Sequence, residues 1–325
     1  MKKIMNKLLQ LILVLLGITI LVFSLLYLIP GDPAVTLLGQ DATQEEINRF
    51  KEQMGLNASY LEQLTKYIAG VAQGDLGKSY IQNESVVDIV LSTLPATLEL
   101  AIVALIIALL IAIPIGILSA VKRGTWIDYL GMIFAQIGVS MPVFWLGLLL
   151  ILGFSIHLNI LPSFGRGDPV VEALLKTITT GNLYYIFESL KYLILPALAL
   201  GLMSAAFITR MVRAAMLEVL QMDYVRTADA KGVSDSIIIL KHAFRNALIP
   251  IVTIIGLQFG NLLGGAIVTE TIFAWPGVGR LIITAISQRD FTVVQGGVLV
   301  IAFLFAIINL IVDVLYTLIN PRIRS

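Results

Sequence analysis

Residues 100–121, LAIVALIIALLIAIPIGILSAV, are 22 consecutive positions without an Asp, Glu, Lys or Arg. A helix needs about 20 apolar residues, each rising about 1.5 Å, to cross the roughly 30 Å hydrocarbon core of a bilayer. Because lipid offers the backbone no hydrogen-bond partner, such a run has to pair its own peptide groups as a helix. This stretch therefore predicts a membrane-spanning helix.

Five further uncharged runs repeat this pattern along the chain. They cover residues 8–29, 129–156, 192–209, 246–269 and 291–312. Each falls within, or slightly above, the range of about 17–25 residues for a spanning helix. The alternating segments of about ten residues that are typical of a membrane β-barrel do not occur in the sequence. We therefore predict an all-α polytopic membrane protein with six transmembrane helices.

The composition of the chain agrees with this prediction. Of its 325 residues, 58% are apolar and 13% are charged, against roughly 45–50% and 25% in soluble domains. The net charge of +1 at pH 7 provides no basic surface for nucleic acid, which is not expected as a partner. There is no cysteine, and His157 and His242 are the only histidines, so no metal site is expected within the chain.

Lys and Arg residues favour one side of the predicted membrane. With a cytoplasmic N-terminus, the inner segments are residues 1–7, 122–128, 210–245 and 322–325, which hold 13 Lys and Arg against five acids. The outer segments have a net negative charge. Basic residues concentrate in cytoplasmic loops of membrane proteins, so both termini are expected in the cytoplasm.

The chain is expected to divide near residue 95. Residues 1–95 hold the first spanning helix and an outer cap with two amphipathic stretches, 44–54 and 60–73. Residues 96–325 are expected to form a five-helix core with an inner loop at 210–245. This loop is long for an inner connection and carries a recognisable pattern.

The pattern in the inner loop predicts two short helices joined at a glycine. Four residues follow the i, i+3, i+4, i+7 spacing of one helix face: Tyr224, Thr227, Ala228 and Lys231. Gly232 ends this helix, and Ser234 is placed to cap the next one. Since Ala228 and Gly232 are four residues apart, one side has little side-chain bulk and fits a partner's groove. A solvated linker helix is the alternative.

Two stretches of this loop resemble the coupling loop of ABC importer permeases, the membrane-spanning subunits of ATP-driven importers. They are RTADAKG at 226–232 and LKHAFRNALIP at 240–250. Four other segments resemble the oligopeptide, dipeptide and nickel branch of this family, in the family's order. They are IPGDP at 29–33, LPSFG at 161–165, ETIFAWPGVGRL at 270–281 and NPRIR at 320–324.

The resemblance implies the type I permease fold in a prokaryotic inner membrane. The chain would be a non-catalytic permease subunit, forming half of the pathway for peptides, nickel or metal chelates. A second related permease, two ATPase subunits and an outer solute-binding protein would be its partners. ATP and Mg would bind to the ATPases, and this chain would hold no cofactor.

The resemblance also implies which loop residues contact the ATPase. They are Tyr224, Arg226, Thr227, Ala228, Lys231, Gly232, Ser234 and Arg245. The general family pattern has an acid and a proline where this chain has Arg226 and Arg245, so an acidic contact at position 226 is not carried over. Ala228 and Gly232 match the pattern.

Two other groups of residues are candidate sites. Pro250, Gly256, Gly260 and Gly264 are candidates for helix packing or for a gate, because small residues four apart let helices approach closely. Glu270, Trp275, Gly277 and Arg280 are candidates for the outer mouth of the pathway. An aromatic anchor at the membrane interface is the other interpretation of Trp275.

Two alternative functions leave the inner loop unexplained. An ion-coupled secondary transporter or channel would need ionisable groups facing a membrane cavity, and only Asp313, Glu99 and Glu270 are available. An intramembrane enzyme would need a metal-binding His pair or a nucleophile motif, and neither occurs in the sequence. The tripeptide GKS at 77–79 lacks the first glycine of a phosphate-binding loop.

Overall fold

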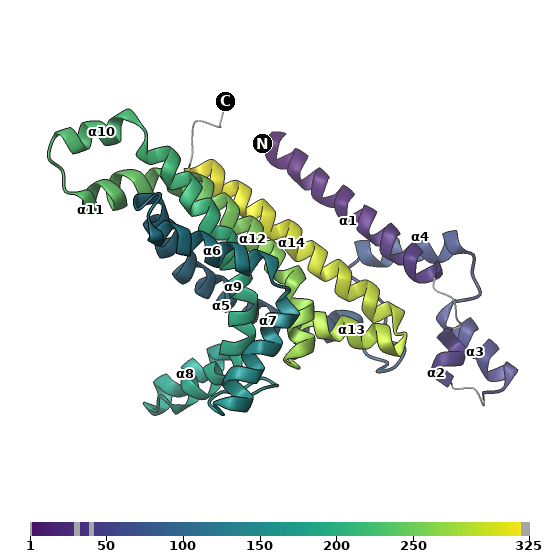
Figure 1. The fold of residues 1–325 in the computed structure, drawn as a ribbon. Coiled ribbons are helices and arrows are strands. Elements are labelled where there is room, and N and C mark those ends of the chain that lie inside the picture. The colour runs from purple at the N-terminus through teal and green to yellow at the C-terminus, as the bar shows by residue number, and fades with distance from the viewer. Residues whose placement is uncertain (1, 29–32, 39–41, 320–325) are drawn as a thin grey trace. The chain divides into compact units, whose positions relative to one another are not determined.

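The computed structural model describes residues 2–28, 33–38 and 42–319, which form helices joined by loops without a named strand (Figure 1). Two compact units are present. One comprises Met1–Pro95 and Pro276–Ala306, and the other comprises Ala96–Trp275 and Ile307–Ser325. In contrast to a simple division at residue 95, residues 276–306 therefore group with the N-terminal part of the chain.

Five helices among the described residues are long and apolar enough to cross a membrane. They are α1 (Lys2–Leu28), α5 (Val86–Val121), α9 (Tyr184–Leu220), the helix from Asp235 to Ile272 that includes α12 (Arg245–Ile272), and α14 (Phe291–Ile319). A sixth span is formed if α6 (Trp126–Ser140) and the helix Val143–His157 count as one bent segment. The prediction of an all-α polytopic protein is confirmed.

The third predicted run is bent rather than straight. The segment Val143–His157 consists of α7 (Val143–Leu150) and a π-helix, η1 (Ile151–His157), and it makes an angle of 105° with α6. Proline restricts the residue before it to extended conformations, and Met141 has φ −88° and ψ 122° ahead of Pro142. By contrast, Pro196 and Pro250 lie inside continuous helices.

The first unit combines α1 with the outer cap. Its cap helices are α2 (Pro33–Leu38), α3 (Gln44–Met54) and α4 (Tyr60–Ala72), and the last two coincide with the predicted amphipathic stretches. The start of α5, α13 (Val278–Gln288) and the first part of α14 bury an aliphatic core that includes Val86, Val90, Val278 and Val293. Because this core needs α13 and α14, residues 1–95 do not form a unit by themselves.

Capping boxes begin both amphipathic helices of the cap. The backbone N–H groups of Thr43 and Ser59 donate to the carboxylates of Glu46 and Glu62, at 2.8 and 2.9 Å. In return, the two hydroxyl oxygens accept from the backbone N–H groups of the same glutamates. Because these bonds favour the ionised carboxylates, the pKa values of Glu46 and Glu62 lie below their ordinary value.

The GKS tripeptide has a structural role in the first unit. The Ser79 hydroxyl is buried and donates to Asp290, with 2.5 Å between the oxygens, while the Tyr80 backbone N–H donates to the same carboxylate. Asp290 directly precedes α14 and is itself buried. These bonds fasten the loop after α4 to the start of α14.

The second unit is built around α9. Its core consists mainly of small residues from α5, α9 and α12, including Ala108, Ala112, Ala205 and Ala247, which let the helices approach closely. Asp128 at the start of α6 accepts two hydrogen bonds from the guanidinium of Arg213 on α9, at 2.6 and 2.8 Å. This bidentate pair fixes one end of α6 on α9.

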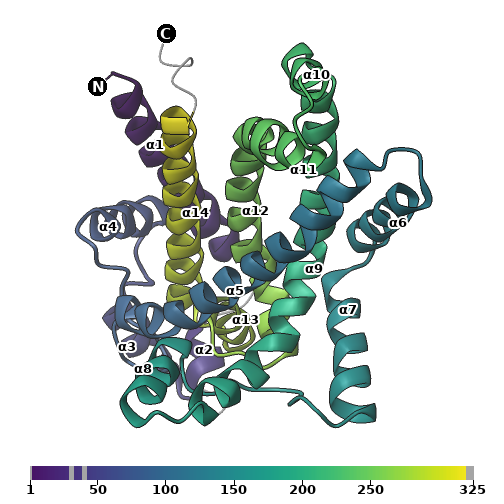
Figure 2. The ribbon, with the colours of Figure 1, turned by 90° about the vertical axis from the view of Figure 1, so that its left-hand side faces the viewer.

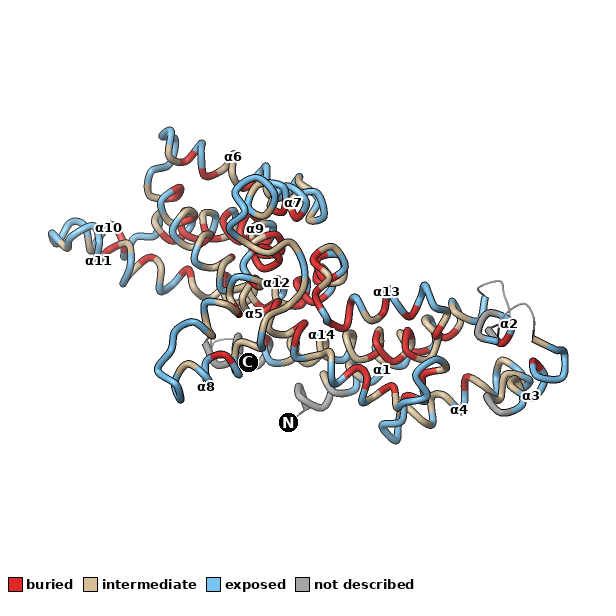
Figure 3. Tube along the Cα trace, turned by 90° about the horizontal axis from the view of Figure 1, so that it is seen from below, coloured by how far each residue is buried: buried red, intermediate tan, exposed pale blue. Residues whose placement is uncertain are grey.

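Two short helical segments lie at opposite ends of α9 (Figure 2). At one end is α8 (Val170–Thr180), which precedes α9 in the chain. At the other end are α10 (Asp223–Ala230) and α11 (Asp235–Ile237). Buried residues, red in Figure 3, follow α9 and α12, whereas α10 and α11 are mostly exposed.

Candidate functional site

The predicted inner loop forms a helical projection at the end of α9. After α9 ends at Leu220, α10 and α11 follow, and a π-helix, η2 (Ile238–Phe244), continues directly into α12. We call residues 221–244 the projection. The first of the two predicted short helices corresponds to α10, which residues 221–222 separate from α9.

A glycine turns the chain between the two arms of the projection, as predicted. Gly232 has a φ of +71°, which a residue with a side chain adopts only with strain. Its N–H donates to the Asp229 carbonyl at 2.8 Å. Ser234 occupies the predicted cap position, and its carbonyl accepts from the Ile237 and Ile238 N–H groups, although its side chain makes no cap hydrogen bond.

Internal contacts hold the arms together. Val225 on α10 and Ile238 on η2 are buried. The Tyr224 hydroxyl accepts from the Asn246 amide at 3.0 Å and donates to the His242 carbonyl at 3.4 Å. Tyr224 therefore braces α10 against the start of α12, a contact that the periodicity of the loop alone does not reveal.

The outer surface of the projection carries exposed charges of both signs, with the aspartates Asp223, Asp229 and Asp235 among the basic residues. Arg226, Thr227, Lys231, Gly232 and Lys241 are exposed, as is Arg245 directly after the projection. Among the described residues, the Arg226 side chain, which is 74% exposed, pairs only with Asp223, at 3.9 Å, and such surface pairs contribute little. The sequence reasoning missed two exposed apolar residues, Ile237 and Leu240. Their i, i+3 spacing on a short polar-flanked helix was the available signal.

The predicted glycine row on α12 does not form one packing face. A Cβ at Gly256 would collide with Val312 on α14, so α12 and α14 are in close contact there. Gly260 is buried, whereas Gly264 is exposed and a Cβ at that position would meet no atom within 4 Å. Residues four apart advance by about 40° around a helix, so the row turns from a packed side to an open one.

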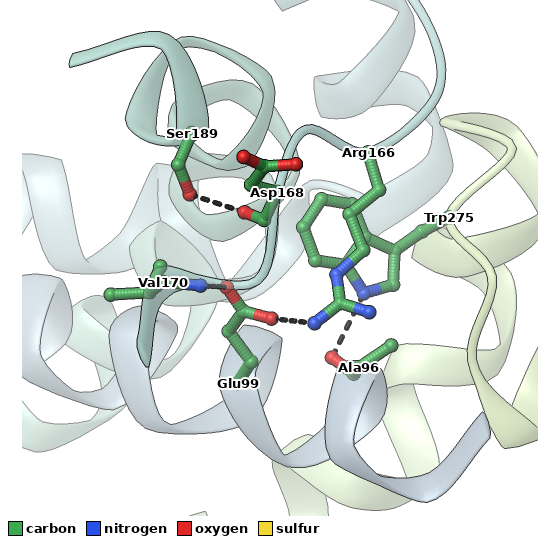
Figure 4. A network of polar contacts seen from close by, with 7 residues as sticks. All are labelled: Ala96, Glu99, Arg166, Asp168, Val170, Ser189 and Trp275. Carbon is green, nitrogen blue, oxygen red and sulfur yellow. Dashed lines mark hydrogen bonds and ion pairs between the residues drawn. The ribbon is translucent and has the colours of Figure 1, made fainter. Parts of the chain in front are cut away.

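A polar network lies at the end of the second unit where α8 begins (Figure 4). Glu99 on α5 forms an ion pair with Arg166 and accepts from the Val170 backbone N–H at 2.8 Å. The Arg166 guanidinium lies 5.5 Å from the centre of the Trp275 ring, and the indole N–H donates to the Ala96 carbonyl at 2.9 Å. The network joins the first half of α5 and the start of α8 to the segment that follows α12.

Trp275 and Glu270 are deeply buried in this region. Trp275 is 1% exposed, which is incompatible with an aromatic anchor at the membrane interface. Glu270 is fully buried on α12 and accepts a hydrogen bond from the Thr97 hydroxyl at 2.6 Å. Gly277 and Arg280 belong to the other unit, Gly277 just before α13 and Arg280 within it.

Comparison with known proteins identifies the family of the chain. Residues 112–325 match the family described as binding-protein-dependent transport system inner membrane component, and residues 1–101 match the N-terminal region described for the same systems. The chain belongs to this permease family.

Relatives of the permease share its full length. The dipeptide transport system permease protein DppB of Alkalihalophilus pseudofirmus is 49% identical and aligned over 98% of both chains. The di/tripeptide permease DppB of Pseudomonas aeruginosa is 43% identical, over 95% of this chain and 94% of that one. The glutathione permease GsiC of Escherichia coli is 41% identical, over 99% and 98%. A solved amino acid ABC transporter with histidines is 16% identical, with a TM-score of 0.48, and covers 72% of this chain and 94% of its own.

Membership of the family settles several predictions. The permease is a multi-pass component of the inner membrane, and it works in a transport complex with ATPase and solute-binding components. ATP hydrolysis belongs to the partner subunits, so the permease itself is not an enzyme. The alternatives of a secondary transporter or channel and of an intramembrane enzyme are therefore excluded.

Parts of the predicted motifs lie outside the described residues. These are residues 29–32 of the IPGDP segment and the whole NPRIR segment at 320–324. Asp313 belongs to α14, but its side chain is not described. Glu99, one of the ionisable groups that a secondary transporter would have needed, pairs with Arg166.

Proposed function

We propose that this permease forms half of the pathway by which short peptides cross the inner membrane in an ATP-driven importer. A second, related permease forms the other half, two ATPase subunits drive the cycle, and an outer solute-binding protein delivers the peptide. The observation that carries the proposal is the 49% identity to a dipeptide permease over 98% of both chains. The names of the reported relatives refer to dipeptides, di/tripeptides and glutathione rather than nickel.

The projection is the surface through which the ATPase drives the permease in this proposal. It lies at the end of α9, its Ile237 and Leu240 side chains are exposed, and among the described residues Arg226 makes only a 3.9 Å ion pair with Asp223. Exposed apolar residues with a polar rim are typical of a protein–protein contact. Since η2 runs directly into α12, a displacement of the docked projection would be transmitted to the membrane core.

In this proposal, ATP binding is coupled to transport because the ATPases contact two arrangements of the permease unequally. When ATP closes the ATPase dimer, the two docked projections are carried with it, and the arrangement of the spanning helices that fits this position becomes favoured. A ligand can shift a conformational equilibrium only by binding its two states unequally. The permease therefore needs no nucleotide site of its own, and no cofactor is proposed for it.

Uptake of a labelled dipeptide tests the substrate. The permease and its partner subunits would be expressed in cells that lack their own peptide permeases. We expect uptake of dipeptides that requires the solute-binding protein and ATP, and that an excess of unlabelled dipeptide suppresses. Uptake of ⁶³Ni²⁺ without uptake of dipeptides would contradict the proposal.

A pair of glycine variants tests the projection. Gly232 and Gly181 both have positive φ, and a Cβ at either would meet no atom within 4 Å. They lie at opposite ends of α9, Gly181 directly after α8. Gly232→Trp should abolish peptide-stimulated ATP hydrolysis and uptake, because the indole obstructs docking, while Gly181→Trp should retain both. Equal effects of the two variants would show that backbone strain, and not docking, accounts for the loss.

A further inference from the structure

One face of α12 is left open along about three turns. Leu257, Asn261, Gly264 and Val268 follow the i, i+4, i+7, i+11 spacing of a single helix face, and all four are exposed. Pro250, on the same face nearer the projection, is exposed as well. A Cβ at Gly264 would meet no atom within 4 Å, so the middle of this face has no side chain covering it.

A pair of amide side chains lies beside the open glycine. The Asn261 Nδ2 donates to Gln258 Oε1 at 2.8 Å, and Gln258 is only 8% exposed. Among the described residues, these two side chains hydrogen-bond only to each other. The carbonyl oxygen of Asn261 and the amide nitrogen of Gln258 therefore remain available, one as acceptor and the other as donor.

The amide pair lies near the middle of α12. Gln258 is in the middle of the 28 residues of α12, which places it about 20 Å from either end at about 1.5 Å per residue. The hydrocarbon core is roughly 30 Å thick, so neither amide reaches the interface. A polar group with unused hydrogen bonds is strongly disfavoured against lipid.

The exposed face of α5 in the same unit has the aliphatic composition that is favourable against lipid. There Ile102, Ile106 and Leu110, spaced four apart, are all exposed and all aliphatic. The α12 face differs in having an asparagine and a bare glycine at its centre. The two helices thus present chemically different surfaces at the same unit's exterior.

We propose that the α12 face lines the translocation pathway and that the Gln258–Asn261 pair binds main-chain amide groups of the peptide in transit. A free carbonyl oxygen and a free N–H match the N–H and C=O groups that every peptide bond presents. The pair is uncharged, so it does not select for the charge of the peptide's side chains, and Gly264 leaves space for them. This inference rests on the proposed function, since it requires a peptide as cargo.

Cysteine labelling tests where the face lies. The permease has no cysteine, so each single-cysteine variant places one thiol in this subunit. Asn261→Cys and Gly264→Cys would be compared with Ile106→Cys and Leu110→Cys in membrane vesicles holding the whole complex, using a charged, membrane-impermeant maleimide. A charged reagent stays out of lipid, so we expect labelling of positions 261 and 264 to be at least about ten-fold faster than of 106 and 110, with a rate that changes when the ATPases are trapped with vanadate.

Two outcomes of the labelling would overturn the assignment. Labelling at 261 and 264 as slow as at 106 and 110, together with quenching of attached fluorophores by brominated lipid, would place the face in the bilayer. Slow labelling with efficient cross-linking of Gly264→Cys to the second permease would place it in a subunit interface.

Substitution of Asn261 tests the hydrogen bond to the peptide. Asn261→Leu keeps the size of the side chain and removes its polar atoms, while Asn261→Gln keeps the amide. Loss of one hydrogen bond corresponds to about a 2- to 13-fold effect, so Asn261→Leu should lower dipeptide uptake by that factor, and Asn261→Gln should restore part of it. Ile106→Leu is the control, and the amount of assembled complex is measured for each variant.

The result separates this inference from the proposed function. If the unaltered complex takes up no dipeptide, the proposed cargo is wrong. If it takes up dipeptide and Asn261→Leu does so equally well, the cargo stands and the role of the amide pair is wrong.

Discussion

The two ends of the second unit differ in whether their charged side chains are paired and buried within the chain. At the α8 end, Glu99, Arg166 and Trp275 find partners within the chain and are largely withdrawn from solvent. At the projection, the charged side chains are exposed, and Arg226 has a single distant ion pair. Polar groups that are satisfied internally hold helices in place, whereas exposed and weakly paired ones are available to another protein. The first end is held by contacts within the chain, and the second is the surface that we propose docks onto the ATPase.

Among the variants that test this comparison, Trp275→Ala is expected to cause the largest loss of stability. Removing a tryptophan that is 1% exposed leaves a cavity and removes the indole hydrogen bond to the Ala96 carbonyl, so the free energy of unfolding should fall by about 3–5 kcal/mol. Trp126→Ala is the control, since Trp126 is 70% exposed and its loss should change stability little. Denaturant-induced unfolding of the purified complex measures both, and equal losses would show that the α8 end is not a packed joint.

A smaller effect is expected from Glu99→Gln. The change leaves the mostly buried Arg166 guanidinium without its counter-charge, which should lower stability by about 2–4 kcal/mol. At the projection, Asp223→Asn removes the carboxylate that lies 3.9 Å from Arg226 in full solvent, and it should leave stability unchanged. A measurable loss of stability in Asp223→Asn would contradict the interpretation of the projection as an unconstrained surface.

The smallest effect is expected at the capping boxes of the first unit, and it depends on pH. The pKa values of Glu46 and Glu62 are lower in the folded protein than the model-compound value of 4.5, because both carboxylates accept backbone hydrogen bonds. Their contribution to stability is therefore complete above pH 4.5 and is lost as the pH falls through the lowered pKa values. Hydrogen exchange of α3 and α4 across this range should show the loss.

Variants of the same two glutamates control for the pH experiment. Glu46→Gln with Glu62→Gln should remove this part of the pH dependence, because a glutamine does not titrate. Exchange in α13, which has no such capping box, should not follow the same curve. If the double variant keeps the full pH dependence of α3 and α4, another group is responsible.

Sequence reasoning located the spanning helices but underestimated their lengths. Counting uncharged positions placed the second run at 100–121, whereas α5 begins at Val86. The difference arises because Glu99, which interrupts the count, is neutralised by Arg166 in the fold. Similarly, α9 begins at Tyr184, before the Lys191 at which the count stopped. Lys191 pairs with Glu188 three residues earlier in the same helix. A charged residue therefore does not end a helix, and a count of uncharged positions finds the apolar run rather than the bounds of the helix.

The candidate sites were predicted unevenly for the same reason. The turn at Gly232 depends on local backbone conformation and was predicted correctly. The burial of Trp275 depends on α5 and the Arg166 segment, and the brace from Tyr224 depends on the start of α12. The open face at Gly264 depends on which neighbours α12 acquires, which helical periodicity does not specify in a chain that is apolar on every side.

The bend at Pro142 decides how many times the chain crosses the membrane before the projection. Neither α6 nor the helix Val143–His157, each 15 residues and about 22 Å long, reaches across roughly 30 Å of hydrocarbon by itself. An even number of crossings between the first residue and the projection leaves both on the same side, and an odd number separates them. The proposed docking, with the projection and the N-terminus on the same side of the membrane, therefore requires the two half-length helices to count as a single crossing.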